Sequence, residues 1–352
     1  MPTYLTRISA ALALLGLAAG ASAEFRQFEM TIEEVEIEVA PGFNAKVWAF
    51  NGQVPGPLIH VVEGDELEVV VHNFTTMSHT IHWHGVYQTG SWQSDGVPDV
   101  TQKAIEPGES YTYRFIVDKP GSLWYHCHVN VAEHVGLRGM WGPLIIDPKE
   151  PTPLEREVTK EAVLMFSGWN SEVAQSYGTG GHPSEVIDYF SINGKSFPMN
   201  QPLRVKKGDV LRLRLYSPTL QVAFHPHGHD ALVTHKDGLP LKNPYPVDVL
   251  AIQPGERYDL IIRMNNPGIW VTHDHIEHHT TNNGADHGGT MLVIEYEEIE
   301  KPDWYMWKDI EYEPDFYMSE SLKRPHGMHD IEAFKGFDPT ARRRATATSM
   351  AH

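Results

Sequence analysis

The chain has 352 residues, of which 41% are hydrophobic, and this is enough for two ordinary domains with complete cores. Its formal net charge of −18 argues against nucleic acid or an anionic membrane surface as a partner, because both are negatively charged themselves. Histidine is the unusual residue type, with 21 copies that gather in clusters, whereas cysteine occurs once.

The N-terminus has the three parts of a secretory signal peptide. Arg7 supplies positive charge, Ile8 to Gly20 form an apolar stretch, and Ala21-Ser22-Ala23 is a cleavage site of small residues. Residues 1–23 are too short for a spanning helix, and no other long apolar run follows. We therefore expect a cleaved signal peptide, a periplasmic or secreted mature protein and no membrane segment. A single cysteine there cannot form an internal disulfide, which favours a protected or metal-bound thiolate.

From Glu24 onward the sequence consists of short segments of alternating polarity, separated by Gly, Pro and Asn. Before residue 147 these segments are 46–50, 57–62, 66–72, 80–84, 110–117, 122–128 and 143–146. No long segment has convincing helical periodicity. The pattern is typical of an all-β fold, either an antiparallel sandwich or a Greek-key barrel.

The whole pattern occurs twice. Three motifs recur in the same order: Gly64-Asp65 as Gly208-Asp209, His82-Trp83-His84-Gly85 as His225-Pro226-His227-Gly228, and His126-Cys127-His128 as His273-Asp274-His275. Matching positions lie about 142 to 147 residues apart, which is close to the length of one domain. The sequence therefore predicts two copies of one β-domain.

The predicted boundaries follow from the repeat. Residues 24–150 form the first domain, 151–300 the second, and a linker rich in acidic residues and proline lies near 147–153. Residues 301–352 are a C-terminal extension. We expect its aromatic start to pack on the sheets or on a neighbouring subunit, and its basic end to fray.

Side-chain alternation divides the histidines between two compartments. In an extended segment, Cys127 points one way while His126 and His128 point the other. By the same parity, His82 and His84 share a face and His79 lies on the side of Cys127. A soft thiolate with imidazoles suits copper, and imidazole clusters suit copper or zinc.

The first domain is thus predicted to build most of one metal site and half of a second. The second domain repeats both histidine pairs as His225, His227, His273 and His275. It has Val222 and Asp274 at the positions of His79 and Cys127, so it lacks a thiolate site. His229, His278, His279 and His287 adjoin these clusters and could support the ligands.

These motifs, together with His134 and Gly139-Met140, resemble the multicopper oxidase family, and within it the two-domain laccase-like branch with its blue copper in the first domain. The resemblance covers nearly all of residues 24–298 and implies tandem cupredoxin-like domains with four copper ions per chain. It implies type 1 copper ligands His79, Cys127 and His134 with Met140 as the weak axial ligand. It further implies His82 and His225 at the type 2 copper, and His84, His126, His128, His227, His273 and His275 at the type 3 pair. His134 follows Cys127 by seven positions, farther than is commonest in the family, so residues 130–133 are expected to form a longer loop.

The resemblance also implies a reaction. A phenol, an aromatic amine or a metal ion gives one electron at the type 1 copper, the electron passes through Cys127 to His126 or His128, and four electrons reduce O₂ to water at the trinuclear cluster. Asp95, in Ser94-Asp95-Gly96, resembles the family's acidic residue near the cluster and would help to deliver protons. An Asp before Gly is also an ordinary turn residue.

The way in which the two domains share the histidine ligands suggests how the chains assemble. A cluster that takes four histidines from each kind of domain must lie at an interface between two domains. The resemblance implies a homotrimer in which the first domain of one chain meets the second domain of the next. An intrachain interface is the alternative.

Three rival functions fit the histidine pattern less well than oxygen reduction does. A copper nitrite reductase is also a two-domain trimer, but it needs only three histidines at a mononuclear copper, whereas His84 and His128 complete a set of eight. A non-enzymatic copper carrier has no use for a thiolate joined to a histidine cluster, and a zinc hydrolase leaves the repeat unexplained. Nothing in the sequence selects the electron donor.

Overall fold

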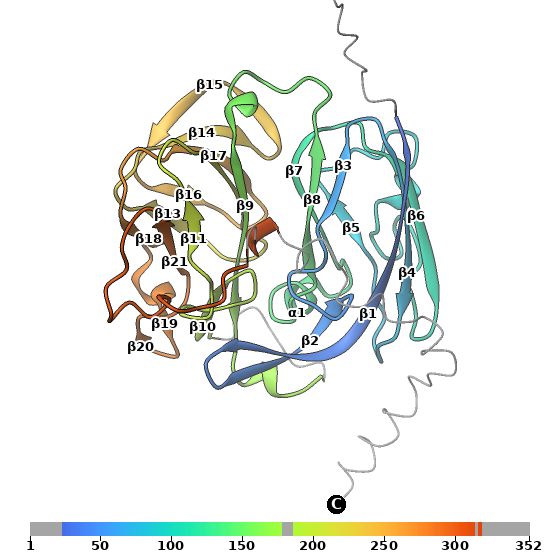
Figure 1. Cartoon of the computed structure of the whole chain (residues 1–352). Coiled ribbons are helices and arrows are strands. Elements are labelled where there is room, and N and C mark those ends of the chain that lie inside the picture. The colour runs from blue at the N-terminus through green and yellow to red at the C-terminus, as the bar shows by residue number, and fades with distance from the viewer. Residues whose placement is uncertain (1–22, 178–185, 314–315, 319–352) are drawn as a thin grey trace, which may run out of the picture.

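The computed structural model describes residues 23–177, 186–313 and 316–318. The predicted signal peptide, except Ala23, and the end of the C-terminal extension lie outside the described residues. Two β-sandwiches stand side by side, built from residues in the first and second halves of the chain (Figure 1). The all-β prediction is therefore confirmed.

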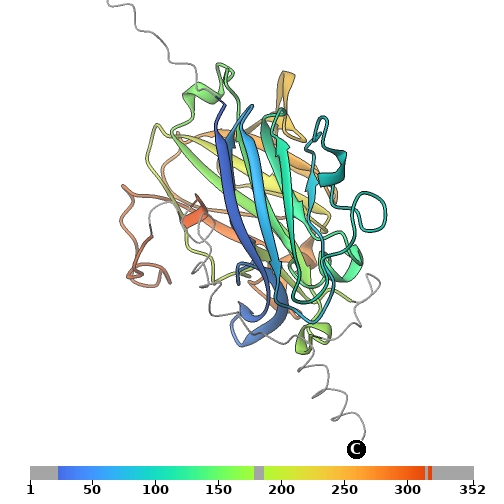
Figure 2. The same ribbon diagram turned by 90° about the vertical axis from the view of Figure 1, so that its right-hand side faces the viewer.

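The first sandwich has two sheets of four strands. One sheet has the order β2 (Phe43–Phe50), β1 (Phe25–Ala40), β4 (Glu66–Asn73) and β6 (Ser110–Ile116), and its strands face the viewer in Figure 2. The other has the order β3 (Ile59–Val62), β8 (Trp141–Asp147), β7 (Gly121–His126) and β5 (His82–His84). Alternate side chains such as Val69, Trp83 and Tyr125 point between the sheets and are fully buried, as the period of two requires.

The second sandwich has a larger sheet packed against a smaller one. The larger has the order β15 (Leu239–Val247), β14 (Ala231–Lys236), β17 (Arg257–Arg263), β12 (Val210–Tyr216), β9 (Lys160–Trp169), β10 (Tyr189–Ile192), β19 (Thr281–Asn282) and β20 (Ala285–Asp286). The smaller has the order β11 (Leu203–Val205), β21 (Met291–Tyr296), β18 (Ile269–Asp274), β13 (Val222–Pro226) and β16 (Leu250–Ile252). Their core is mainly aliphatic, with Leu213, Leu260 and Ile294 fully buried.

The strand pairing repeats as the sequence does. In the first sandwich β5 pairs with β7 so that His82 lies directly opposite His126, and in the second β13 pairs with β18 so that His225 lies opposite His273. Each sandwich also contains two parallel pairs, β1 with β4 and β3 with β8, then β9 with β12 and β11 with β21. These parallel pairs are an addition to the mainly antiparallel pairing that the sequence predicted.

The described helices are all short. They are η1 (Trp92–Ser94), α1 (Val131–His134), η2 (Glu155–Glu157), η3 (Val173–Gln175), η4 (Glu277–Thr280) and η5 (Phe316–Met318). The longer loop expected after Cys127 takes the form of α1, which starts after Asn130 in a left-handed conformation (φ 40°). None of these helices has the length and apolar character that crossing a membrane requires.

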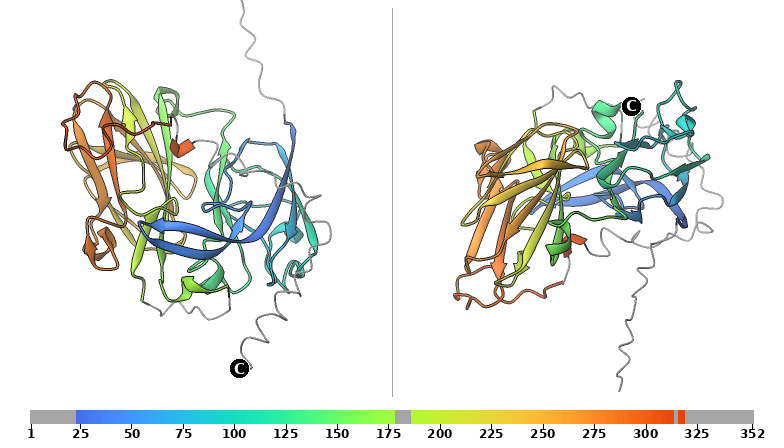
Figure 3. Two further views of the ribbon diagram at one scale, coloured as in Figure 1. Left: turned by 60° about the horizontal axis from the view of Figure 1, so that its bottom comes forward. Right: turned by 90° about the horizontal axis from the view of Figure 1, so that it is seen from above.

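The two sandwiches are joined by apolar contacts. Trp124 and Trp141 of the first pack against Val163 and Tyr216 of the second. The β1–β2 hairpin extends from the first sandwich toward the second, where it packs around Trp169 (Figure 3). Because interior packing is dense, these contacts hold the sandwiches in one relative position.

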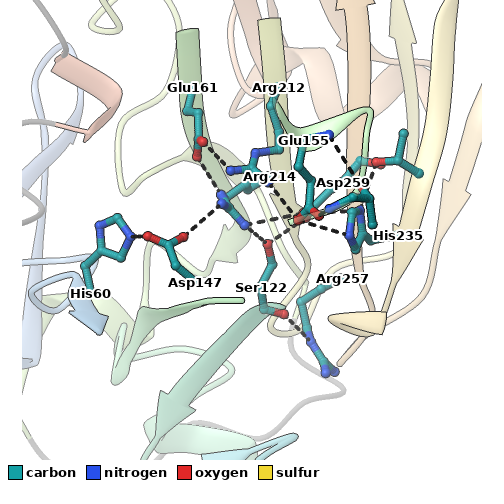
Figure 4. Close-up of polar contacts among 12 residues, drawn as sticks. His60, Ser122, Asp147, Glu155, Glu161, Arg212, Arg214, His235, Arg257 and Asp259 are labelled. Carbon is teal, nitrogen blue, oxygen red and sulfur yellow. Dashed lines mark hydrogen bonds and ion pairs between the residues drawn. The ribbon is translucent and has the colours of Figure 1, made fainter. Parts of the chain in front are cut away.

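A buried polar network lies in the same interface (Figure 4). Arg214 donates to Ser122 Oγ at 2.8 Å, to Glu161 Oε2 at 2.9 Å and to Asp259 Oδ2 at 3.3 Å. Ser122 belongs to β7 of the first sandwich, and the other three belong to the second. Arg214 is therefore a charged side chain, almost fully buried, that pairs with the buried carboxylate of Asp259 and the partly buried carboxylate of Glu161.

Replacing Arg214 with methionine is expected to lower the free energy of unfolding by about 3–5 kcal/mol, because the carboxylate of Asp259 would remain buried without the arginine that pairs with it. Arg263→Gln, which breaks an exposed 2.6 Å pair with Glu157, is the control and should cost less than about 1 kcal/mol. Urea unfolding followed by tryptophan fluorescence measures both. Equal losses in the two variants would contradict the assigned role of Arg214.

The described part of the C-terminal extension packs on the second sandwich. Tyr305 and Trp307 contact Val293, and Tyr317 belongs to the second core. Trp304, by contrast, is 82% exposed. The prediction that the aromatic start of the extension covers the sheets thus holds for these three residues.

Candidate metal centre

The first group of potential ligands surrounds Cys127, directly after the end of β7. Cys127 Sγ lies 3.2 Å from His134 Nδ1 and 3.7 Å from His79 Nδ1, and all three residues are fully buried. Met140 is buried in the same core cluster as Cys127. Its amide donates to the His134 carbonyl and its carbonyl accepts from the Cys127 amide, both at 3.1 Å. The structure thus brings together all four residues predicted for the type 1 site.

Hydrogen bonding fixes which nitrogen His79 presents to Cys127. The Thr75 hydroxyl donates to Asn73 Oδ1 at 2.8 Å, so its oxygen can accept a hydrogen bond from the N–H of His79 Nε2, also at 2.8 Å. The Nδ1 lone pair of His79 is then left facing the sulfur. Burial keeps the pKa of His79 well below its usual value, and burial, with the Arg138 charge, lowers that of His134 to about 4.

Burial acts in the opposite direction on the thiol. The buried surroundings of Cys127 raise the pKa of its thiol to about 12. Without a cation the sulfur would stay protonated, and two neutral imidazoles would face it. A bound metal cation reverses this preference, because it stabilises a thiolate directly.

The second group lies on the opposite face of β5 and β7. Trp83 and Tyr125 point into the core, while His82, His84 and His126 offer ligand atoms that all lie within 4.8 Å of one another. The predicted division of side chains by parity is therefore observed in this strand pair. The His128 ring centre lies 5.3 Å from that of His82, so His128 borders the group of three.

Backbone carbonyls orient these imidazoles. His82 Nδ1 donates to the Asp95 carbonyl at 2.7 Å, and His126 Nδ1 donates to the Cys127 carbonyl at 2.8 Å. Each Nε2 is thereby left with its lone pair toward the group. Gly96 allows this approach, because a Cβ there would lie 1.8 Å from the Ile81 carbonyl oxygen.

Asp95 lies where the sequence placed it, beside the cluster. Its carboxylate is 3.4 Å from His82 Nδ1. The second sandwich adds a cation on the other side, where Arg257 lies against Gly85. Burial and then the Arg257 charge lower the pKa of His84 to about 3, so His84 is neutral and able to bind a metal at neutral pH.

The second sandwich carries the matching group at the end of β13 and β18. The rings of His225, His227, His273 and His275 have centres between 4.9 and 5.7 Å apart in each contacting pair. His225 Nδ1 donates to the Asp248 carbonyl at 3.0 Å, with the carboxylate at 3.6 Å. Asp248 is therefore the counterpart of Asp95, and the sequence analysis did not identify it.

The second sandwich has a hydrogen-bonded Asp–His pair in place of the thiolate site. Asp274, at the position of Cys127, contacts His279 Nδ1 at 2.6 Å, and its other oxygen accepts the amides of Ala223 and Ile276. Both side chains are buried. His279, which the sequence marked as a neighbour of the ligands, is thus the partner of Asp274.

Within the chain the two histidine groups face different surroundings. His84 lies next to Gly255, in the turn between β16 and β17, and not next to the histidines of the second sandwich. In the described residues no ring contact joins one group to the other.

Comparison with known proteins identifies the family. Multicopper oxidase sequences match residues 31–151 and again residues 167–285, which together exceed half of the chain. The protein belongs to the multicopper oxidase family, and its two sandwiches are cupredoxin-like domains.

Individual relatives agree with this assignment. The chain is 32% identical over 309 residues to Laccase-12 of Oryza sativa subsp. japonica, which covers 81% of this chain and 52% of the relative. It thus spans about half the length of the curated relatives it matches. Two solved structures are similar over 86% of this chain and 95% of theirs: the multicopper oxidase mgLAC (60% identity, TM-score 0.83) and the blue copper oxidase from Nitrosomonas europaea (53%, 0.82).

The residues present suit the copper that the family implies. A soft thiolate with two imidazoles is a donor set that suits copper, and a buried methionine is available beside it. Neutral imidazoles held in one tautomer by backbone carbonyls suit a cluster of copper ions.

Proposed function

We propose that this protein is a laccase-like multicopper oxidase that couples one-electron oxidation of a phenol, an aromatic amine or a metal ion to the four-electron reduction of O₂ to water. Copper, when bound, supplies the redox chemistry. The observation that carries the proposal is the pairing of His82 with His126 and of His225 with His273 in the same register, beside a Cys–His–His group.

The chain's own residues would share the work as follows. His79, Cys127 and His134, with Met140, would hold the type 1 copper. His82 and His225 would hold the type 2 copper, and His84, His126, His128, His227, His273 and His275 the type 3 pair, giving four ions per chain. Cys127 is bonded through the backbone to His126 and His128, the shortest covalent connection between the two sites. Asp95, whose carboxylate lies 3.4 Å from His82 Nδ1, would help to deliver protons to the cluster.

The proposed assembly is a homotrimer in which each first domain meets the second domain of the next chain. Large apolar side chains are exposed beside both half-sites: Tyr87 and Trp92 in the segment that carries Asp95, and Tyr245 and Val249 on either side of Asp248. Exposed apolar groups of this kind are typical of protein interfaces. A head-to-tail contact closes into a ring. We further propose that the chain is exported to the periplasm or secreted.

The proposal predicts close to four copper ions per chain in the loaded protein. The oxidised form should show an intense absorption near ~600 nm from the copper–thiolate bond and one EPR-silent copper pair. Oxygen uptake should follow addition of a phenol. About two ions per chain, both visible by EPR, with reduction of nitrite in place of oxygen, would instead establish the rival nitrite reductase.

A further inference from the structure

The outer side of His134 is closed by protein. Its side chain is fully buried, and its Nε2 has no hydrogen-bond partner among the described residues. The ring meets the Trp48 ring at an angle of 60°, with 4.6 Å between centres. Trp48 comes from β2, so a strand of the first sandwich forms the first layer over the imidazole.

Arg138 forms the next layer. Its guanidinium carbon lies 5.3 Å from the centre of the Trp48 ring, a cation–π arrangement, and no more than about 10 Å therefore separates the guanidinium from the His134 ring. Arg138 is 1% exposed. A positive charge so far from water acts on its neighbours with little screening.

The guanidinium of Arg138 also forms hydrogen bonds that link the second sandwich to the surroundings of His134. Arg138 Nη1 donates to the carbonyls of Val173 and Ser176, in and after η3, and to that of Lys46 in β2. Its Nη2 donates to Glu133 Oε1 at 3.3 Å. Glu133 immediately precedes His134 and is as buried as Arg138. One arginine thus holds three chain segments over the candidate type 1 site.

We propose that Arg138 is a positioning residue of the type 1 site: its buried charge favours the reduced, less positive form of the bound copper, and its clamp on residues 173–176 keeps water from His134. Glu133 opposes the charge in part and fixes the guanidinium in place. The inference rests on the proposed function, since it concerns the copper that His134 would hold.

Opposite shifts test the proposal. In copper-loaded protein, the reduction potential of the type 1 copper is measured by redox titration of the absorbance near ~600 nm. Arg138→Gln should lower the reduction potential, so that at a fixed solution potential the ratio of reduced to oxidised protein falls about tenfold. This is the size of effect expected for one buried charge within about 10 Å. Glu133→Gln should raise the potential, because it leaves Arg138 unopposed.

Two further variants separate charge from structure. Arg138→Lys keeps the charge but loses the fork that reaches three carbonyls, so its potential should stay closer to wild type than that of Arg138→Gln. Arg263→Gln removes an exposed arginine and should leave the potential unchanged. If Arg138 had a purely structural role, its variants would have a lower melting temperature and an unchanged reduction potential of the type 1 copper.

The outcomes remain distinguishable from failure of the proposed function. A wild-type protein without the blue absorption overturns the function itself. A blue protein in which Arg138→Gln and Glu133→Gln have the wild-type potential, or shift it in the same direction, overturns the inference. If Arg138→Gln does not fold, the sign of the Glu133→Gln shift decides alone, and a lowered or unchanged potential contradicts the proposal.

Discussion

Replacing Cys127 with serine is expected to remove the ~600 nm absorption and to lower oxygen uptake with a phenol by more than about 100-fold. The change removes the thiolate sulfur that faces His79 and His134, and loss of even an outer partner of a metal ligand costs up to about 100-fold. Copper analysis should show about one ion fewer per chain. The ligands of the trinuclear cluster are untouched, so its EPR-silent pair should remain.

Asp274→Ser is the matched control for Cys127→Ser. It places serine at the equivalent position of the second sandwich, where a carboxylate hydrogen-bonded to His279 stands in place of a thiolate. The blue absorption should survive in this variant. If Cys127→Ser kept the band, or if Asp274→Ser lost it, the assignment of the type 1 site to the first sandwich would be wrong.

Two inactive variants are expected to restore activity to each other. His84→Ala damages the half-site of the first sandwich, and His227→Ala damages that of the second. In a head-to-tail trimer formed from an equal mixture, about a quarter of the interfaces would join an intact first domain to an intact second domain. Co-expression with two different affinity tags isolates the mixed assemblies, whose oxygen uptake is then measured.

The control for this complementation is a mixture of two variants in the same half-site, His84→Ala with His126→Ala. No interface in that mixture has an intact first domain, so activity should stay at the level of either variant alone. An intrachain cluster makes a different prediction, because every chain would carry its own defect. Failure of His84→Ala and His227→Ala to complement in isolated mixed assemblies would therefore favour the intrachain alternative.

The features that the sequence predicted depend on short-range geometry. Alternation along an extended chain is enough to put His82 and His84 on one face and Trp83 on the other, and the structure has this arrangement. The repeat then carries the same argument to the second sandwich. The all-β fold followed from alternation as well, because strand periodicity is visible within a few residues.

The features that the sequence did not predict depend on contacts between distant segments. Asp248 is 23 positions from its partner His225, whereas Asp95 is only 13 from His82, because the β14–β15 hairpin intervenes in the second sandwich. The clamp of Arg138 joins β2 and η3, which are 92 and 35 positions away. The parallel strand pairs likewise arise where the chain crosses between sheets.

The hydrogen bond between Asp274 and His279 has a consequence for how the chain matures. Both partners are protein side chains, so this pocket is complete as soon as the second sandwich folds. The corresponding pocket of the first sandwich leaves a protonated thiol among uncharged imidazoles until a cation arrives. Of these two equivalent pockets, metal binding to the folded form stabilises only that of the first sandwich. The two pockets therefore mature unequally: the Asp274–His279 pocket is complete once the chain has folded, and the Cys127 pocket is completed only when a metal ion binds.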